Sequence, residues 1–182
     1  MNKKPEILST KEVAKTRIFR VEELQLKFSN GEQRTYERLK AGGSGAVLIV
    51  AINENNELLL IREYSAGIDA YELALPKGLI DNNEAALEAA NRELKEEVGF
   101  GARELVELKK VTLAPGYLSH KMSIVLARDL YVEKLEGDEP EPIEVVPMSF
   151  DDIDAIIARD DFTEARSIAA LYLARQYLSQ QQ

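Results

Sequence analysis

Residues 78–100 read GLIDNNEAALEAANRELKEEVGF, and this stretch decides the fold of the 182-residue chain. Residues 84–98 predict a helix on which Glu93, Glu96 and Glu97 are spaced i, i+3 and i+4 and therefore share one face. A neighbouring apolar stripe can dock on a sheet; it comprises Leu87, Ala90, Leu94 and Val98. Three carboxylates at this spacing repel one another, so the face favours a divalent cation, for which carboxylate oxygens are preferred ligands.

The helix alone is also compatible with a solvated amphipathic helix in a Glu-rich chain. The whole pattern fixes two glycines, four glutamates, one arginine and two apolar positions, and a chance match is roughly one in a million. It resembles the Nudix box, G-x5-E-x7-R-E-U-x-E-E-x-G-U, where U is apolar, at every specified position.

The resemblance implies the Nudix fold, an α/β class α/β/α sandwich around a mixed β-sheet. It also implies that a metal-bound water attacks phosphorus in a diphosphate. The same resemblance assigns the metal to Glu93, Glu96, Glu97 and the backbone carbonyl of Gly78. It gives the remaining charged box residues, Glu84 and Arg92, a structural role in the motif.

Segments beyond the box are similar to the bacterial Nudix hydrolases of ADP compounds; they are FSNGEQRTYER, PGYLSHKM and LEGDEPEP. This similarity implies hydrolysis of ADP-ribose, NADH and diadenosine polyphosphates to AMP and the phosphorylated remainder. Related ADP-ribose pyrophosphatases have alanine where this chain has Lys77, so the similarity does not extend to a strict preference for ADP-ribose.

Composition restricts the metal and the partners. The chain has no cysteine and one histidine, His120, so any metal must be bound by oxygen, which indicates Mg²⁺ or Mn²⁺. The net charge of −9 argues against nucleic acid as a partner, whereas a small nucleotide can bind through a bridging metal. No apolar run approaches the ~18 residues of a membrane span, and residues 1–17 lack the apolar core of a secretory signal. We therefore expect no membrane partner and a cytoplasmic location.

The chain is expected to divide at a glycine-rich linker, Ala41–Gly45, into an N-terminal segment, 1–44, and a Nudix domain, 45–182. Residues 18–40 predict a β-hairpin with an Asn30-Gly31 turn and an apolar face, which we expect to contribute to a homodimer interface. Further strands are predicted at 46–52, 57–64, 71–75, 104–113, 122–132 and 143–147, and further helices at 151–159 and 163–178.

The loop 135–142 places four carboxylates in eight residues, stiffened by two prolines. If it closes over a diphosphate, Glu139 is the candidate general base and Glu141 a further metal ligand, an order that resembles the E-x-E loop of ADP-ribose pyrophosphatases. The alternatives are a solubilising loop and a base within the box, for which Glu96 is the candidate. Candidate substrate contacts are Arg62, Lys77 and Tyr117, with Tyr64 as a further stacking candidate.

Two other functions remain open at this point. An RNA-end pyrophosphohydrolase would need a basic channel, which the net charge does not favour. A catalytically silent nucleotide-binding Nudix module would usually have a degenerate box, and this box is intact.

Overall fold

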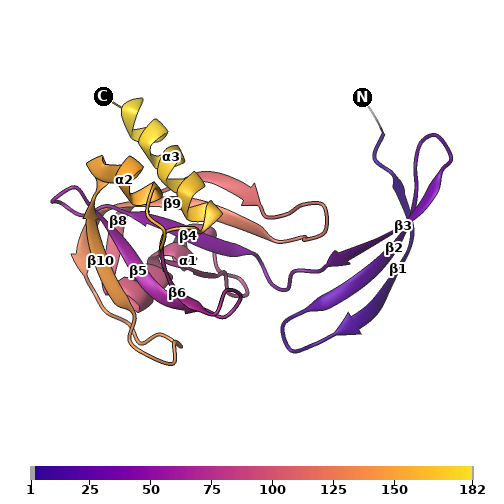
Figure 1. Ribbon diagram of the computed structural model, residues 1–182, viewed down its shortest axis with the longest axis horizontal. Helices are drawn as coiled ribbons and strands as arrows, with labels where there is room; N and C mark the ends of the chain where they lie inside the picture. The colour runs from indigo at the N-terminus through magenta and orange to yellow at the C-terminus, as the bar shows by residue number, and fades with distance from the viewer. Residues whose placement is uncertain (1–2, 182) are drawn as a thin grey trace. The chain divides into compact units, whose positions relative to one another are not determined.

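The computed structural model describes residues 3–181, which form two compact units (Figure 1). One unit comprises Met1–Gly45 together with Thr112–Lys121, and the other comprises Ala46–Val111 and Met122–Gln182. The sequence did not predict that 112–121 groups with the N-terminal strands. No helix among residues 3–181 is long and apolar enough to cross a membrane.

The first unit is a three-stranded antiparallel sheet of β1 (Glu6–Lys15), β2 (Arg20–Lys27) and β3 (Gln33–Leu39). The predicted hairpin is confirmed as β2 and β3, and its turn contains Gly31 at φ 89°. Strand β1 was not predicted because all ten of its residues are exposed, so it lacks the alternation of a half-buried strand. Segment 112–121 joins this unit through hydrogen bonds between Leu39 and the backbone of Tyr117 and Ser119, at 2.7 and 3.1 Å.

The second unit contains two sheets. The strands are β4 (Ala46–Ala51), β5 (Glu57–Ser65), β6 (Ala70–Ala74), β7 (Lys77–Leu79), β8 (Phe100–Thr112), β9 (Lys121–Val132) and β10 (Glu144–Ser149). In the order β7-β4-β9-β8, β4 runs parallel to β9 and antiparallel to β7. In the order β10-β5-β6, both pairings are antiparallel. The predicted α/β class with a mixed sheet is therefore confirmed.

The helices are α1 (Ala86–Glu93), which continues into the π-helical turn η1 (Leu94–Val98), then η2 (Phe150–Asp152), α2 (Ile153–Ile157) and α3 (Ala165–Ser179). Both α1 and α3 pack on β4, and Figure 1 shows them on opposite sides of that strand. Every β4 residue is buried. Because side chains alternate along a strand, Val47 and Ile49 face the α1 core while Leu48 faces the other layer. This is the predicted sandwich.

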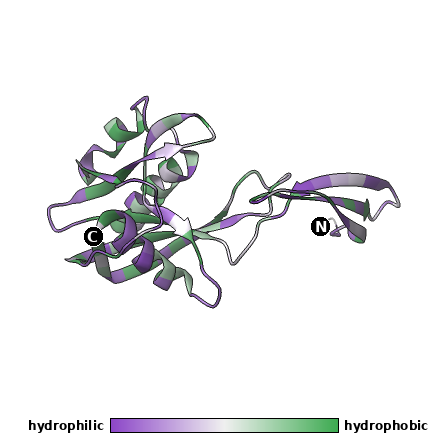
Figure 2. Ribbon diagram, turned by 90° about the horizontal axis from the view of Figure 1, so that it is seen from below, coloured by the Kyte–Doolittle hydropathy of each residue, from purple (hydrophilic) through white to green (hydrophobic). Residues whose placement is uncertain are grey.

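Hydrophobic residues lie along the strands of the second unit, and hydrophilic residues dominate its turns (Figure 2). The docking stripe of α1 differs from the prediction at one position. Ala90, Leu94 and Val98 are buried as expected, but Leu87 is 37% exposed. Ala86 lies i−4 from Ala90 and packs against this core instead.

Candidate metal and diphosphate site

The loop before α1 is held to the helix by Arg92. Its guanidinium donates two hydrogen bonds of 3.0 Å to the carboxylate of Glu84 and one of 2.9 Å to the carbonyl of Leu79. The Arg92 contact lowers the pKa of Glu84, which stays ionised. Arg92 therefore fixes β7, the loop and α1 relative to one another.

The same guanidinium also contacts the glutamates of the box. Nη1 of Arg92 donates to Glu93 Oε1 at 2.8 Å and to Glu96 Oε2 at 2.9 Å. Because a guanidinium offers five N–H donors, one side chain serves both the loop and the acidic face. In this structure Arg92 supplies part of the positive charge that these carboxylates need.

Two of the three glutamates are buried. Glu93 is 8% exposed and Glu97 is 3% exposed. Burial, which disfavours the charged form, raises the pKa of Glu93 to about 7 and that of Glu97 to about 8. Arg92 opposes this rise at Glu93, and Lys77 opposes it at Glu97. A site that holds carboxyl groups in this state is suited to a cation, because bound positive charge favours their ionised form.

Gly78 allows β7 to approach this acidic face. A Cβ atom added at Gly78 would overlap the carboxyl group of Glu93. The first glycine of the box is therefore required by close approach, since every other residue would displace Glu93.

The residues present fit a divalent cation. Among residues 3–181 no three acidic or imidazole side chains are already gathered at metal-binding distance. Arg92 holds Glu93 and Glu96, while the backbone amide of Lys77 holds Glu97 at 2.8 Å. Carboxylate and carbonyl oxygens are nevertheless the donors that Mg²⁺ and Mn²⁺ prefer. Side-chain rotations would be needed to bring these oxygens onto one ion.

The acidic loop lies beside the box helix, as its proposed role requires. Its start is bonded to η1, through Glu133 N–H to the Gly99 carbonyl at 3.1 Å and Leu135 N–H to the Lys95 carbonyl at 3.2 Å. The charge of Glu139 contributes to the raised pKa of Glu93. We call the space between the acidic loop and η1 the loop cavity. It has a volume of about 510 Å³, and its lining includes Glu96, Glu139 and Glu141.

The three candidate substrate residues lie in three different surroundings. Nζ of Lys77 lies 2.5 Å from Glu63 Oε2, next to the buried Glu97. Arg62 forms ion pairs with Asp161 at 3.1 Å and with Glu144 at 3.3 Å, so its charge is already shared. Tyr117 belongs to the other unit and is described only with it.

Two residues near the site were missed by the sequence analysis. Glu63 pairs with Glu72 across β5 and β6, an arrangement of like charges that destabilises a sheet unless each has its own partner. Lys77 is that partner for Glu63, and Thr163 Oγ1 donates to Glu72 at 2.7 Å. Tyr71 donates a 2.5 Å hydrogen bond to Glu141. Strand pairing would have indicated both residues, but pairing cannot be obtained from one sequence.

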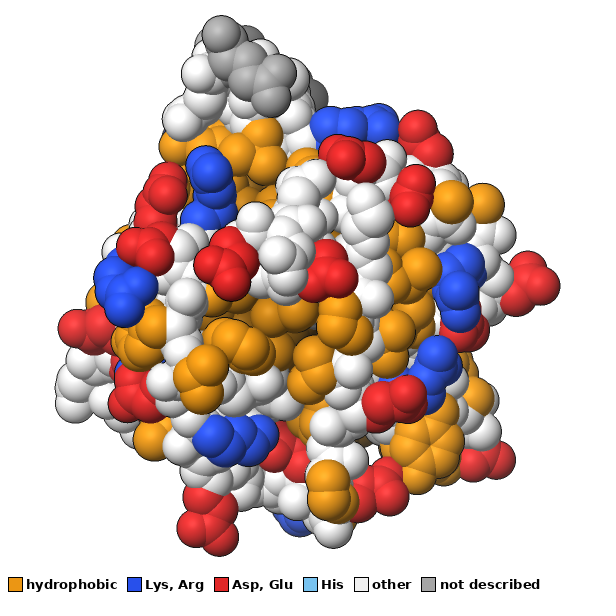
Figure 3. Space-filling model, turned by 90° about the vertical axis from the view of Figure 1, so that its left-hand side faces the viewer, with side chains coloured by type: hydrophobic (Ala, Val, Ile, Leu, Met, Phe, Trp, Pro, Cys, Tyr) orange, Lys and Arg blue, Asp and Glu red, His pale blue; other side chains and the backbone are white. Residues whose placement is uncertain are grey.

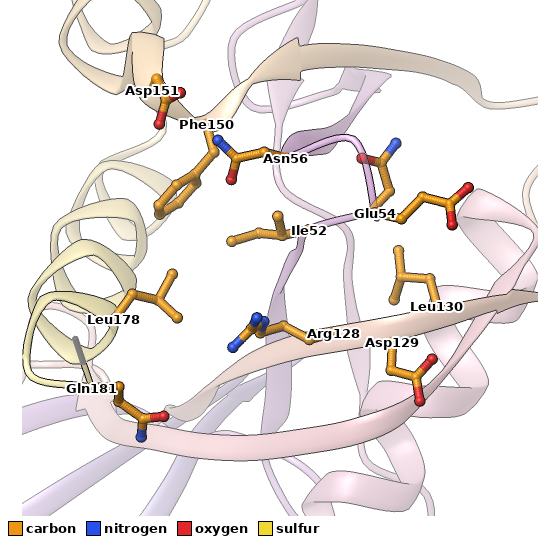
Figure 4. A pocket seen from close by; sticks show the side chains of 11 residues that line it. Ile52, Glu54, Asn56, Arg128, Asp129, Leu130, Phe150, Asp151, Leu178 and Gln181 are labelled. Carbon is orange, nitrogen blue, oxygen red and sulfur yellow. The ribbon is translucent and has the colours of Figure 1, made fainter.

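A larger cavity of about 690 Å³ lies elsewhere in the second unit. Figure 4 shows Ile52, Phe150 and Leu178 pointing into it, with Arg128 beside them. None of its lining residues belongs to the box or the acidic loop. The candidate site is therefore based on the buried carboxyl groups and not on the size of a cavity.

The chain is similar to known proteins over nearly its whole length. Residues 5–38 match the model of the NudE-type Nudix hydrolase N-terminal domain, and residues 44–171 match the NUDIX domain. The chain is 52% identical over 178 residues to the ADP compounds hydrolase NudE of Escherichia coli (strain K12), covering 98% of this chain and 95% of the relative. It is 27% identical over 173 residues to an ADP-ribose pyrophosphatase of Bacillus subtilis (strain 168), covering 90% and 91%. A crystal structure of an ADP compounds hydrolase superimposes with a TM-score of 0.93 at 51% identity, covering 100% of this chain and 97% of that one.

Proposed function

The chain belongs to the Nudix hydrolase family, and from that membership we propose that it hydrolyses the pyrophosphate bond of ADP-containing compounds. The products are AMP and the phosphorylated remainder of the substrate. The observation that carries the proposal is the placement of the buried acids Glu93 and Glu97 beside a loop that presents Glu139. The similarity to hydrolases of ADP compounds supports the substrate class.

Nudix hydrolases generally need a divalent metal, and we propose Mg²⁺ or Mn²⁺ for this chain. The residues that would hold it are Glu93, Glu96 and Glu97, with the Gly78 carbonyl and Glu141 as further donors. When bound, such an ion neutralises charge on the diphosphate oxygens and makes water acidic near neutral pH. The role of Glu84 and Arg92 is to keep the loop and helix in place, which their mutual hydrogen bonds support.

Glu139 is our candidate for the group that removes a proton from the attacking water. It lines the loop cavity with Glu96 and is close enough to Glu93 to influence its pKa. Glu96 is the alternative base, but it is already bonded to Arg92 at 2.9 Å. Since Glu139 is not tied to the box in this way, it is the freer of the two to move a proton.

Lys77 is the better supported of the phosphate contacts. Its ammonium group has one ion-pair partner, Glu63, whereas Arg62 has two, Asp161 and Glu144. An ammonium beside the metal-binding carboxylates is suited to a phosphate oxygen, because it adds positive charge where the substrate is most negative. Arg62 and Tyr117 remain predictions as substrate contacts.

The division at residues 44 and 45, the homodimer and the cytoplasmic location also remain proposals. The hairpin face expected to form the interface is Leu24, Leu26 and Phe28, and of these Leu24 is already buried at 7% exposed. Other apolar side chains of the first unit support an interface role, because Ile7, Val13 and Phe19 are between 42% and 52% exposed.

A panel assay tests the function. ADP-ribose, NADH, diadenosine triphosphate and capped RNA are each incubated with the purified chain and Mg²⁺ or Mn²⁺, and the products are separated by chromatography. We expect AMP from the three ADP compounds, no release from the capped RNA, and no activity in excess EDTA. On the face drawn in Figure 3, acidic and basic side chains are interspersed around a hydrophobic centre, without the continuous basic stripe that RNA would favour. Decapping without turnover of ADP compounds would overturn the proposal, and binding without any turnover would indicate a silent module.

A further inference from the structure

Two tyrosines face each other at the ends of β5 and β6. Tyr64 and Tyr71 are paired in the strand register, and their ring centroids are 5.6 Å apart at an interplanar angle of 64°. They are 46% and 54% exposed. We call the space beside them the tyrosine cleft; it has a volume of about 200 Å³, and its other lining residues include Pro140, Pro142 and Ile143.

Both hydroxyl groups of the tyrosine cleft are already engaged. Tyr64 donates a 2.6 Å hydrogen bond to Asp69, and Tyr71 donates a 2.5 Å hydrogen bond to Glu141. The hydrogen bonds fix the two rings by their polar ends, while large parts of both side chains remain open to solvent. Exposed rings held in this way form a rigid surface on which another ring can stack at little cost in conformational entropy.

The tyrosine cleft adjoins the proposed reaction site. Residues 139–143 line both the cleft and the loop cavity, so this segment is a wall common to the two. A substrate whose diphosphate lies in the loop cavity therefore carries its outer groups close to Tyr71.

The volume and lining of the tyrosine cleft restrict what it can hold. Pockets for whole drug-sized ligands run to roughly 300–1,000 Å³, so a smaller space suits one ring system. Pro140 and Pro142 carry no backbone N–H, and both tyrosine hydroxyls have partners. Five charged side chains also line the cleft, but Arg62 is paired with Glu144, Glu63 with Lys77 and Glu141 with Tyr71, which leaves Glu139. Few groups are therefore left to identify the edge of a base. Stacking without such contacts tolerates different rings. The ADP compounds share one adenine and differ in the other half of the molecule. A stacking surface suits that variable half, because selecting the shared adenine would need specific hydrogen bonds.

We propose that the tyrosine cleft binds the planar heteroaromatic ring on the half of the substrate that is not the ADP moiety, by stacking on Tyr71 and Tyr64. The nicotinamide of NADH and the second adenine of a diadenosine compound are rings of this kind. ADP-ribose has no such ring, because its outer half ends in a ribose. The inference rests on the proposed hydrolysis of ADP compounds.

The test compares substrates with and without an outer ring. For the full chain, kcat and KM are measured with NADH, diadenosine triphosphate and ADP-ribose in the wild type, Tyr71→Ala and Tyr71→Phe. Tyr172→Ala is the matched control, because Tyr172 is a 44% exposed tyrosine on α3 that lines neither cavity. We expect Tyr71→Ala to raise KM about tenfold for NADH and for diadenosine triphosphate, and less than about twofold for ADP-ribose. Tyr71→Phe keeps the ring and should keep KM within about threefold for all three substrates.

A binding measurement makes the inference testable without turnover. In excess EDTA, the fluorescence of the reduced nicotinamide is followed as NADH is titrated with each protein. We expect saturation with the wild type and with Tyr71→Phe, and a dissociation constant about tenfold higher with Tyr71→Ala. Equal rises in KM for all three substrates would overturn the inference, as would unchanged KM values and NADH binding in a folded Tyr71→Ala. If no ADP compound is hydrolysed, the proposed function fails, while the titration still decides whether the cleft takes the ring.

Discussion

The backbone amide of Lys77 donates a 2.8 Å hydrogen bond to Oε2 of Glu97. This bond joins β7 to η1 and gives a buried carboxyl group one of its few polar partners. An amide side chain at position 97 could accept the same bond through its oxygen, so the charge of Glu97 can be removed while the contact is kept.

We therefore expect Glu97→Gln to fold normally and to lose more than nine tenths of kcat at saturating Mg²⁺. A tenfold loss corresponds to ~1.4 kcal/mol of transition-state stabilisation. Steady-state kinetics and thermal unfolding measure the two effects. Glu104→Gln, at an exposed position on β8, is the matched control and should retain wild-type activity. If Glu97→Gln keeps more than about a tenth of the activity, Glu97 is not a principal ligand.

Gly78→Ala should weaken metal binding by displacing Glu93. The added Cβ overlaps the carboxyl group of Glu93, which must move away from its present position. We expect the metal concentration for half-maximal activity to rise at least about tenfold, the scale typical for disturbing a metal ligand's surroundings. Gly67→Ala is the control, because a Cβ there meets no atom within 4 Å. A Gly78→Ala protein with wild-type metal dependence would show that Glu93 does not need this position.

The stability of the metal-free protein should fall as pH rises. The pKa values of Glu93 and Glu97, about 7 and about 8, lie above 4.5, the ordinary pKa of a glutamate side chain. Between pH 4.5 and about 8, Glu93 and Glu97 hold more protons in the folded protein than in the unfolded chain. The free energy of unfolding therefore decreases as the pH rises through this range. Melting temperatures in EDTA should therefore fall more steeply with pH in the wild type than in a Glu93→Gln/Glu97→Gln double variant.

Added Mg²⁺ or Mn²⁺ should reverse this loss, since a cation favours the ionised carboxylates and stabilises the folded state that binds it. We expect the stabilisation by metal to grow across the same pH window. Parallel curves for the wild type and the double variant, with and without metal, would contradict both the burial argument and the assignment of the site.

Glu139→Gln tests the general base. Base catalysis typically contributes ~10²–10⁴-fold, so kcat should fall at least a hundredfold with KM nearly unchanged. In single-turnover measurements across pH, the variant should lose the rise in rate with pH that deprotonation of the base produces. Asp138→Asn is the control, because Asp138 is an exposed acid on the same loop. If Glu139→Gln stays within about threefold of the wild type while Glu96→Gln loses the pH dependence, the base belongs to the box.

The protein should be a homodimer that uses the first unit. All ten residues of β1 are exposed, and open strand edges with apolar side chains favour pairing with another chain. Light scattering at micromolar concentration should give twice the mass of one chain. The double variant Ile7→Glu/Val13→Glu should shift this toward the monomer, whereas Val132→Glu, at an 81% exposed position of the second unit, should not. A monomeric wild type would refute the prediction.

Local patterns predicted much of this molecule. The buried strand 46–51 is a continuous apolar run, and the Asn30-Gly31 turn lies between β2 and β3. The helix after Gly78 follows from the spacing of its apolar and acidic residues. Each of these depends on residues close together in the chain, which is why one sequence was sufficient.

Contacts between distant segments could not be predicted in this way. The ion pair of Lys77 with Glu63 and the hydrogen bond of Tyr71 with Glu141 depend on how β5, β6 and the acidic loop come together. Arg62 is a second example, in which a distant contact makes a predicted role less favourable. It was singled out as a substrate contact, but its partner Asp161 lies 99 residues away, on the segment between α2 and α3.

The π-helical turn η1 makes the length of the box as important as its composition. The Gly99 N–H bonds the Leu94 carbonyl five residues earlier, at 3.1 Å, so this turn contains one residue more than an α-helical turn. Deleting Lys95 or Glu96 would close the turn and rotate Glu97 by about 100° relative to Leu94 and the preceding helix. The segment should therefore tolerate substitutions at exposed positions and no insertion or deletion. In a collection of active random length variants, gaps should be found in exposed turns such as 29–32 and be absent from η1.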